Sequence, residues 1–188
     1  LYEARKVNTS KIENYLSETL KRLSMPNVEI RIDLNLIELP HFYGLDQLKI
    51  YVSINKGSSF NEISDVASGG EMSRILLAMK SLLNKENSIA TIIFDEIDTG
   101  VSGKVAIEVG QLLKELAIKS QVFSITHLPQ VASLGEHHFK VEKTENELRA
   151  FTSISKLSKE SRVLEIASML GGEKPGKAAI DNASELLN

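Results

Sequence analysis

The run TIIFDEID, residues 91–98, constrains the fold of this chain more than any other segment. Its apolar start is typical of a buried strand, and two adjacent carboxylates, Asp95 and Glu96, come at the end of that strand. In open α/β sheets this end faces a crevice in which ligands bind. Because neighbouring side chains on a strand point to opposite faces, Asp95 and Glu96 are expected to do different jobs unless the chain turns between them. The pattern suits one carboxylate near a metal ion and another near a water molecule.

The composition bounds the class of protein. With 188 residues, 42% of them hydrophobic, the chain is long enough for one substantial core, or one core with a small appendage. The formal charge of -3 gives no global basic signal, so a nucleic-acid partner cannot be inferred from charge. The absence of cysteine excludes disulfides, and no apolar run reaches the roughly 18 residues of a membrane helix. We expect a soluble, cytoplasmic protein, and the start at Leu1 inside a helical pattern indicates a piece of a longer chain.

The amino-terminal part predicts a helix followed by an antiparallel hairpin. Helical spacing of apolar residues over 1–23 indicates an amphipathic helix, which Pro26 prevents from continuing. The period then changes to two over 28–36 and again over 48–54, on either side of the turn-prone PHFYG. We expect these two runs to pair with one face toward water. The helical positions are Ile12, Leu16, Leu20 and Leu23.

The rest of the chain predicts a parallel α/β crossover. After a polar loop at 55–67, a helix begins near Met72; a strand at 89–95, a helix at 104–117 and a strand at 121–126 follow. This order predicts two parallel strands joined by a helix. The apolar stripe of the first helix is expected at Met72, Ile75, Leu76, Met79 and Leu83. Further on, we expect a hairpin of 137–143 with 148–155, and helices at 160–170 and 177–187.

The segment ASGGE, residues 67–71, has two interpretations. Ser68 and Glu71 form a capping box, which alone would start a helix. That box does not require Gly69 and Gly70, each of which costs a helix up to about 1 kcal/mol relative to alanine. Two glycines indicate that another group approaches the backbone closely. Phosphate is a candidate, because amides at a helix N-terminus favour an anion.

The strand ends also allow two interpretations each. Asp95 and Glu96 are either a solvated strand end, or a pair in which Asp95 holds Mg²⁺ and Glu96 orients or deprotonates a water molecule. In the following loop, Asp98 is either a turn residue or a contact. His127 lies at the end of strand 121–126, on the edge where Asp95 is expected. It is either a structural hydrogen-bonding residue or part of the same site.

Two further patterns are expected to be misleading. Residues 171–177, GGEKPGK, formally fit a phosphate-binding loop, but Ala178 replaces the Ser or Thr that Mg²⁺ requires, and helical residues 164–170 precede it instead of a strand. We expect a helix end and a turn there. His137 and His138 have no companion cysteines, so a metal site is not expected at them.

Three segments in this order resemble the carboxyl-terminal half of an ABC-type ATPase head. They are ASGGEMSRILLAMKSLL, TIIFDEIDTGVSG and QVFSITHLPQVAS, which are similar to the ABC signature, to Walker B with the D-loop, and to the switch-histidine region. The last two favour the RecN family of DNA repair proteins, relatives of the SMC proteins. The ending SRVLEIASMLGG is also similar to that family, although Ser161 stands where an acidic residue is usual. The resemblance covers about residues 40–172, and arguably the whole chain.

The resemblance implies a fold and a set of site residues. It implies an α/β partial ATPase head in which a parallel sheet is flanked by helices and antiparallel hairpins, with residues 1–25 as the end of a coiled-coil helix and 26–188 as the signature and Walker B half. It implies ATP and Mg²⁺ as cofactors, with Asp95 as the metal ligand and Glu96 and His127 acting on ATP of their own head. Nucleotide contacts are implied for the signature residues Ser68, Gly69, Gly70 and Glu71, and for Asp98 of the D-loop.

The resemblance also implies partners. The Walker A loop of the family lies at the other end of the polypeptide, so the expected partners are this Walker A half, a second copy of the head across sandwiched ATP, and DNA through the full-length protein. The 188 residues alone are expected to hydrolyse no ATP, and the parent is expected in the cytoplasm near the nucleoid. One alternative is a dimerisation and partner-docking module with little catalytic role. Another is a stand-alone Mg²⁺-dependent hydrolase that uses Asp95, Glu96 and His127.

Overall fold

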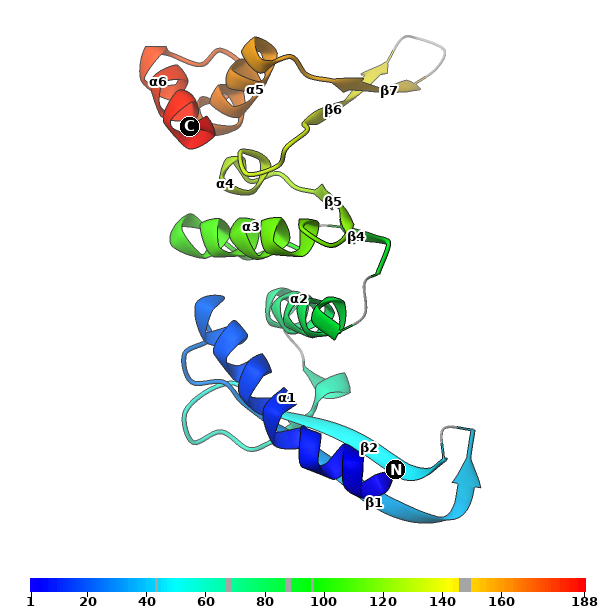
Figure 1. Ribbon diagram of the computed structural model, residues 1–188. Coiled ribbons are helices and arrows are strands. Elements are labelled where there is room, and N and C mark those ends of the chain that lie inside the picture. The colour runs from blue at the N-terminus through cyan, green and yellow to red at the C-terminus, as the bar shows by residue number, and fades with distance from the viewer. Residues whose placement is uncertain (43, 67–68, 87–88, 96, 146–149) are drawn as a thin grey trace.

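The computed structural model describes residues 1–42, 44–66, 69–86, 89–95, 97–145 and 150–188. Its elements are α1 (Tyr2–Arg22), β1 (Glu29–His41), β2 (Gly44–Ser53), β3 (Asn61–Glu62), the 3-10 helix η1 (Ile63–Asp65), α2 (Gly69–Glu86), β4 (Thr91–Asp95), α3 (Gly103–Ala117), β5 (Gln121–Ile125), α4 (Pro129–Ala132), β6 (Phe139–Glu145), β7 (Ala150–Lys156), α5 (Lys159–Gly171) and α6 (Lys177–Leu187). They stack largely in chain order, from α1 with its hairpin to α5 and α6 (Figure 1). The predicted α/β fold, with a parallel sheet, antiparallel hairpins and an N-terminal helix, is confirmed.

The helix α1 lies along the first hairpin. It buries Leu16 and Leu20, and the chain leaves the helix through Ser24, whose φ of 59° is a left-handed conformation. Strands β1 and β2 pair antiparallel, as predicted, with Ile30 opposite Val52. Both strands are longer than the alternating pattern indicated, since backbone pairing continues to His41 opposite Gly44. The segment expected as a polar loop contains the short β3 and η1.

Strands β4 and β5 form the predicted parallel pair, joined by α3. The register runs from Thr91 opposite Gln121 to Asp95 opposite Ile125. One face of this pair is covered: Ile92 and Phe94 of β4 are buried within the main hydrophobic core. Helix α3 has six buried residues, of which all except Gly110 belong to that core. These α3 residues are Ala106, Val109, Gly110, Leu112, Leu113 and Leu116.

The opposite face of the β4–β5 pair is not covered by the described chain. Ile93, Phe123 and Ile125 point away from the core and are 62%, 45% and 56% exposed. All three lie on the same face, because Ile93 is opposite Phe123 and Ile125 is two residues further along β5. We call these three residues the open face.

The helix α2 lies between α1 and α3 (Figure 1), and this position corrects its predicted stripe. Leu76 and Leu83, expected in the stripe, are 47% and 54% exposed, whereas Leu77 and Ala78 are buried beside Ile75. A helix packed against neighbours on two sides buries a wider and differently placed arc than a single stripe predicts. The helix also begins three residues before Met72, because its first turn contains Gly69 and Gly70, which add no apolar side chain to the pattern.

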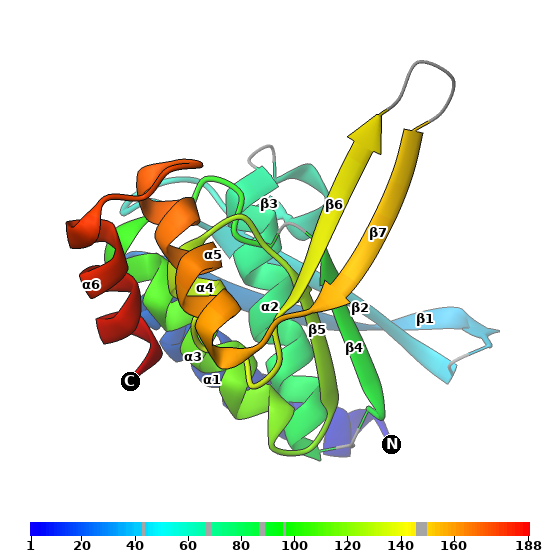
Figure 2. The same cartoon turned by 90° about the horizontal axis from the view of Figure 1, so that it is seen from above.

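The carboxyl-terminal elements form a separate part of the molecule. The hairpin β6–β7 extends away from the helices (Figure 2), and α5 and α6 pack around a small second cluster of Ile166, Ala167 and Ala183. GGEKPGK is a connection between these helices, and Gly172 ends α5 with φ 84°. The predicted helix end and turn are therefore confirmed. No helix in the described part of the chain combines the length and the hydropathy that a membrane span requires.

Candidate functional site

The structure brings Asp95 and His127 to the same edge of the parallel pair. Asp95 is the last residue of β4, is exposed, and lies opposite Ile125 at the end of β5. His127 follows Ile125 by two residues, and its side chain is 68% exposed. Glu96 lies outside the described residues. The predicted location of Asp95 and His127 at one strand edge is confirmed, and this edge belongs to the same sheet as the open face.

Asp98 lies beneath His127. Its side chain is 0% exposed, Oδ2 accepts a hydrogen bond from Thr126 Oγ1, and Oδ1 lies 3.6 Å from His127 Nδ1. Its backbone carbonyl accepts from Val101 N–H at 3.1 Å, across a turn in which Gly100 has φ 71°. Asp98 is thus a turn residue, as one interpretation expected. Because the carboxylate is buried, a contact with nucleotide would have to pass through its neighbours.

Gly69 and Gly70, at the start of α2, have different surroundings. A Cβ on Gly70 would lie 2.9 Å from the backbone oxygen of Thr99, whereas a Cβ on Gly69 would meet no atom within 4 Å. The close approach that the sequence indicated is therefore made at Gly70 by the loop after β4. Gly69 leaves open space at the start of α2, while Ser68 lies outside the described residues. The approach at Gly70 brings the start of α2 next to the loop that carries Asp98.

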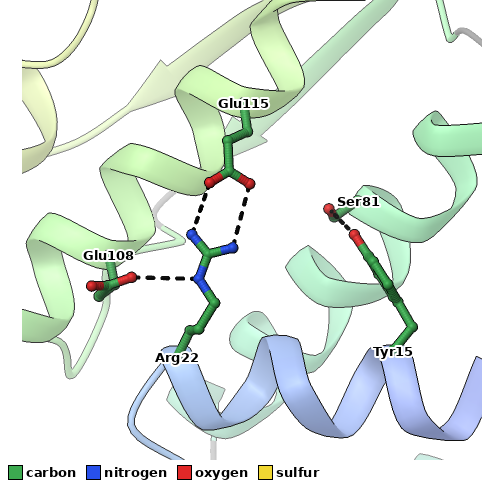
Figure 3. Close-up of polar contacts among 5 residues, drawn as sticks. All are labelled: Tyr15, Arg22, Ser81, Glu108 and Glu115. Carbon is green, nitrogen blue, oxygen red and sulfur yellow. Dashed lines mark hydrogen bonds and ion pairs between the residues drawn. The ribbon is translucent and has the colours of Figure 1, made fainter.

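Polar contacts join α1 to α2 and to α3 (Figure 3). Tyr15 Oη and Ser81 Oγ of α2 are 2.8 Å apart. Arg22 donates to both carboxylate oxygens of Glu115, at 2.8 and 3.4 Å, and lies 3.6 Å from Glu108, both on α3. Hydrogen bonding to Glu115 raises the pKa of Arg22, against a smaller opposing effect of burial. These contacts were not predicted from the sequence, in which the residues that make them are only polar positions between the apolar positions of the helices.

Arg162 of α5 holds the segment that follows His127. Its Nη2 donates to the carbonyl oxygens of Ala132, Ser133 and Gly135 at the end of α4. Burial lowers the pKa of this guanidinium. Arg162 belongs to the segment SRVLEIASMLGG, whose resemblance to the family was noted from the sequence. Its hydrogen bonds were not predicted, because they join elements about thirty residues apart.

The edge presents one exposed carboxylate, that of Asp95, as a candidate ligand for a metal ion. Within the described ranges, no three acidic, histidine or cysteine side chains gather into a metal cluster. Mg²⁺ is usually bound by one or two carboxylates together with substrate phosphates and water, so a single exposed carboxylate such as Asp95 suits it.

Comparison with curated proteins finds DNA repair proteins named RecN among its relatives. The chain is 37% identical over 189 aligned residues to the DNA repair protein RecN of Haemophilus influenzae, covering 100% of this chain and 34% of that protein. It is 36% identical to RecN of Deinococcus radiodurans, over 98% and 32% of the two chains, and 42% identical to RecN of Bacillus subtilis, over 77% and 25%. The chain thus spans about a third of the length of the first of these relatives. No protein-family model matches it.

Comparison with solved structures finds the same fold in SMC heads. The head domain of Smc with a coiled coil and joint from Pyrococcus yayanosii has a TM-score of 0.65 at 21% identity, over 89% of this chain and 30% of that one. A chain from a study of ATP-driven dimerization and DNA-stimulated activation of SMC ATPases has a TM-score of 0.58 at 22% identity, over 94% of this chain and 100% of that one. These likenesses establish the fold as part of an SMC-like head.

Proposed function

Since this chain belongs to the RecN family, we propose that it supplies the signature, Walker B, D-loop and switch-histidine half of an ATPase head. ATP hydrolysis then requires a Walker A half from elsewhere in the parent polypeptide, and a second head across the bound nucleotide. The 188 residues by themselves are expected to be inactive. In the parent, ATP-driven pairing of heads would serve DNA double-strand break repair.

The observation that supports a further half of the head is the open face, which lies beside the strand edge with Asp95 and His127. Parallel sheets occur almost only with both faces covered, yet Ile93, Phe123 and Ile125 are uncovered in the described chain. A two-stranded parallel pair also has too few strands to be stable without further packing. A further part of the head, packed on this face, would cover the apolar side chains and bring its own groups to the edge that carries Asp95.

The start of α2 is suited to a phosphate from the second head. A helix N-terminus presents amide hydrogens and a positive partial charge, both of which favour an anion. The space at Gly69 allows a ligand to approach the backbone, while Gly70 is occupied on one side by the Thr99 carbonyl. We assign the γ-phosphate contact to Ser68, Gly69 and Gly70, with Glu71 as the first acidic residue of the helix.

The strand edge is assigned to ATP held by the same head. Asp95 holds Mg²⁺, which supplies neutralisation of phosphate charge when bound. Glu96 orients or deprotonates the attacking water, a role that needs a carboxylate within hydrogen-bond reach of that water. His127, exposed at the same edge, contacts the reacting phosphate or the water.

The biological setting follows from the family. The curated relatives are DNA repair proteins, so we assign the parent protein to break repair in the cytoplasm, near the nucleoid, with DNA bound through the full-length protein.

ATP turnover by a mixture of the two halves tests the proposal. The 188-residue chain alone should release no phosphate from ATP, and the addition of a Walker A half should restore Mg²⁺-dependent release that Glu96→Gln abolishes. Metal-dependent turnover by the isolated chain would instead support the stand-alone hydrolase. If Glu96→Gln left turnover of the mixture unchanged, Glu96 would not be the general base.

A dimerisation and docking module with little catalytic role is the second candidate. It is favoured by apolar side chains near the tip of the β1–β2 hairpin, where Leu36, Leu39 and Phe42 are 62%, 81% and 91% exposed. Light scattering on the parent protein separates the candidates. Dimers that form only with ATP favour the ATPase head, whereas dimers that form without nucleotide and through this chain alone favour docking between two copies.

A further inference from the structure

Among the described residues, the carboxylate of Asp98 is hydrogen-bonded through one of its two oxygens. Oδ2 accepts from Thr126 Oγ1, whereas Oδ1 is buried and has no hydrogen-bond partner within the part of the chain that the structure describes. A buried polar oxygen without a hydrogen-bond donor is costly, so its presence calls for an explanation. His127 Nδ1 lies 3.6 Å from this oxygen.

The hydrogen bonds of Thr126 fix the orientation of this carboxylate. The Thr126 hydroxyl accepts from the backbone N–H of Leu128 at 3.0 Å. Since a hydroxyl has a single proton to donate, that proton goes to Asp98 Oδ2. The backbone carbonyl of Asp98 is engaged by Val101, so the loop carrying the carboxylate is fixed at its own turn. Oδ1 is therefore held facing the histidine ring.

We propose that Thr126 and Asp98 are positioning residues for His127. Asp98 Oδ1 accepts the Nδ1–H of the imidazole, and Thr126 keeps the carboxylate in the orientation that allows it. A shift of roughly half an ångström brings the present separation into hydrogen-bonding range. The tautomer of a histidine is set by the hydrogen bond that one ring nitrogen makes, so this contact leaves Nε2 for the exposed edge that also carries Asp95.

The same pair has a purely structural interpretation, in which the Thr126–Asp98 hydrogen bond only fastens the loop after β4 to the end of β5. That interpretation predicts lost stability on substitution, but no effect on which ring nitrogen of His127 carries the proton. The protonated nitrogen therefore distinguishes positioning from fastening.

Nitrogen-15 NMR of the imidazole in the 188-residue chain, at a pH where the ring is neutral, provides the first test. We expect His127 to carry its proton on Nδ1 in the unmodified chain and in Thr126→Ser, and to shift toward the Nε2–H form in Thr126→Val. An Nε2–H tautomer in the unmodified chain would overturn the proposal, and so would an Nδ1–H tautomer that Thr126→Val leaves unchanged. If Thr126→Val does not fold, the tautomer in the unmodified chain and in Thr126→Ser still tests the proposal, because an Nε2–H form in either would contradict it.

ATP turnover of the assembled head provides the second test, and this catalytic consequence rests on the function proposed above. Thr126→Val should lower kcat by about 10- to 100-fold, as misplacement of a catalytic group does, with KM for ATP nearly unchanged. Thr126→Ser should restore kcat. An unchanged kcat in Thr126→Val would overturn the catalytic consequence. Failure of the ATPase proposal itself would be recognised separately, by absence of turnover in the unmodified mixture, while the NMR result is independent of it.

Discussion

The two faces of the β4–β5 pair differ in how far their apolar side chains are buried. On one face, Ile92 and Phe94 are buried in the main core; on the other, Ile93 and Phe123 are 62% and 45% exposed. The strands and their register are shared, so the difference lies in what covers each face. The covered face has α3 and the rest of the core, while the open face has nothing from the described chain. The described chain therefore covers one face of the parallel pair and leaves the other exposed.

The largest effect is expected from the same substitution made on each face. Phe94→Ala should lower the free energy of unfolding by about 3–5 kcal/mol, because it removes a buried ring and leaves a cavity. Phe123→Ala should change it by less than about 1 kcal/mol, since that ring remains half in water in this chain. Urea unfolding followed by circular dichroism measures both. Equal losses would mean that the open face is covered in solution.

The next effect concerns association. Ile93→Lys should leave the stability of the isolated chain nearly unchanged but weaken binding of a Walker A half by about 100-fold, because it buries an unpaired charge at the contact. Isothermal titration of the two halves measures it. Ile118→Lys is the matched control, since Ile118 is 82% exposed directly after α3. If both variants bind like the unmodified chain, the second half packs elsewhere.

A smaller effect on stability is expected at Gly69 and Gly70. Gly70 is packed against the loop after β4, whereas Gly69 faces open space. Gly70→Ala should destabilise the chain by about 1–3 kcal/mol, because the Thr99 carbonyl must move to admit the methyl group. Gly69→Ala should be neutral or stabilise by up to about 1 kcal/mol, since alanine is the better helix former and meets no neighbour. Thermal unfolding compares the two variants, and a larger loss from Gly69→Ala would contradict the packing described.

The smallest effect is expected at His138, which is half-buried and lies near charged residues of α5. Burial lowers the pKa of His138, and the positive charges of Arg162 and Lys140 act in the same direction, against Glu165. The unfolded chain therefore binds more protons near pH 6.5, so stability should fall as pH is lowered from about 7.5 to about 5.5. His138→Gln should flatten this slope in urea unfolding, and His137→Gln, at an exposed neighbour, is its control. A slope that survives in His138→Gln would assign it to other groups.

The parallel crossover was predictable because its signals are local. A short apolar run that ends in carboxylates, an amphipathic helix and a second apolar run fix the order, and the shared edge of Asp95 and His127 follows from it. The stripe of α2 was not predictable, since whether Leu76 or Leu77 is buried depends on helices on two sides. The family resemblance assigned motifs that spacing alone left open.

The burial of Asp98 under His127 was also beyond the sequence. Asp98 and Thr126 are 28 residues apart, and only the parallel register brings the ends of the two strands together. Threonine directly before histidine at a strand end was the available signal, although the same pair also occurs wherever a strand simply stops. The Thr126–Asp98 hydrogen bond distinguishes a positioned histidine from an ordinary strand end, and the residue types alone do not.

The central claim is that two heads share each ATP site, with Ser68 acting on the nucleotide of the other head and Glu96 on that of its own. The most direct test mixes two inactive parent proteins, Glu96→Gln and Ser68→Arg, and measures ATP turnover. Every mixed dimer then contains one intact site, so the mixture should recover about a quarter of the unmodified rate if subunits exchange at random. If the two residues served the same nucleotide within one head, every site would carry a defect, and the mixture would stay inactive.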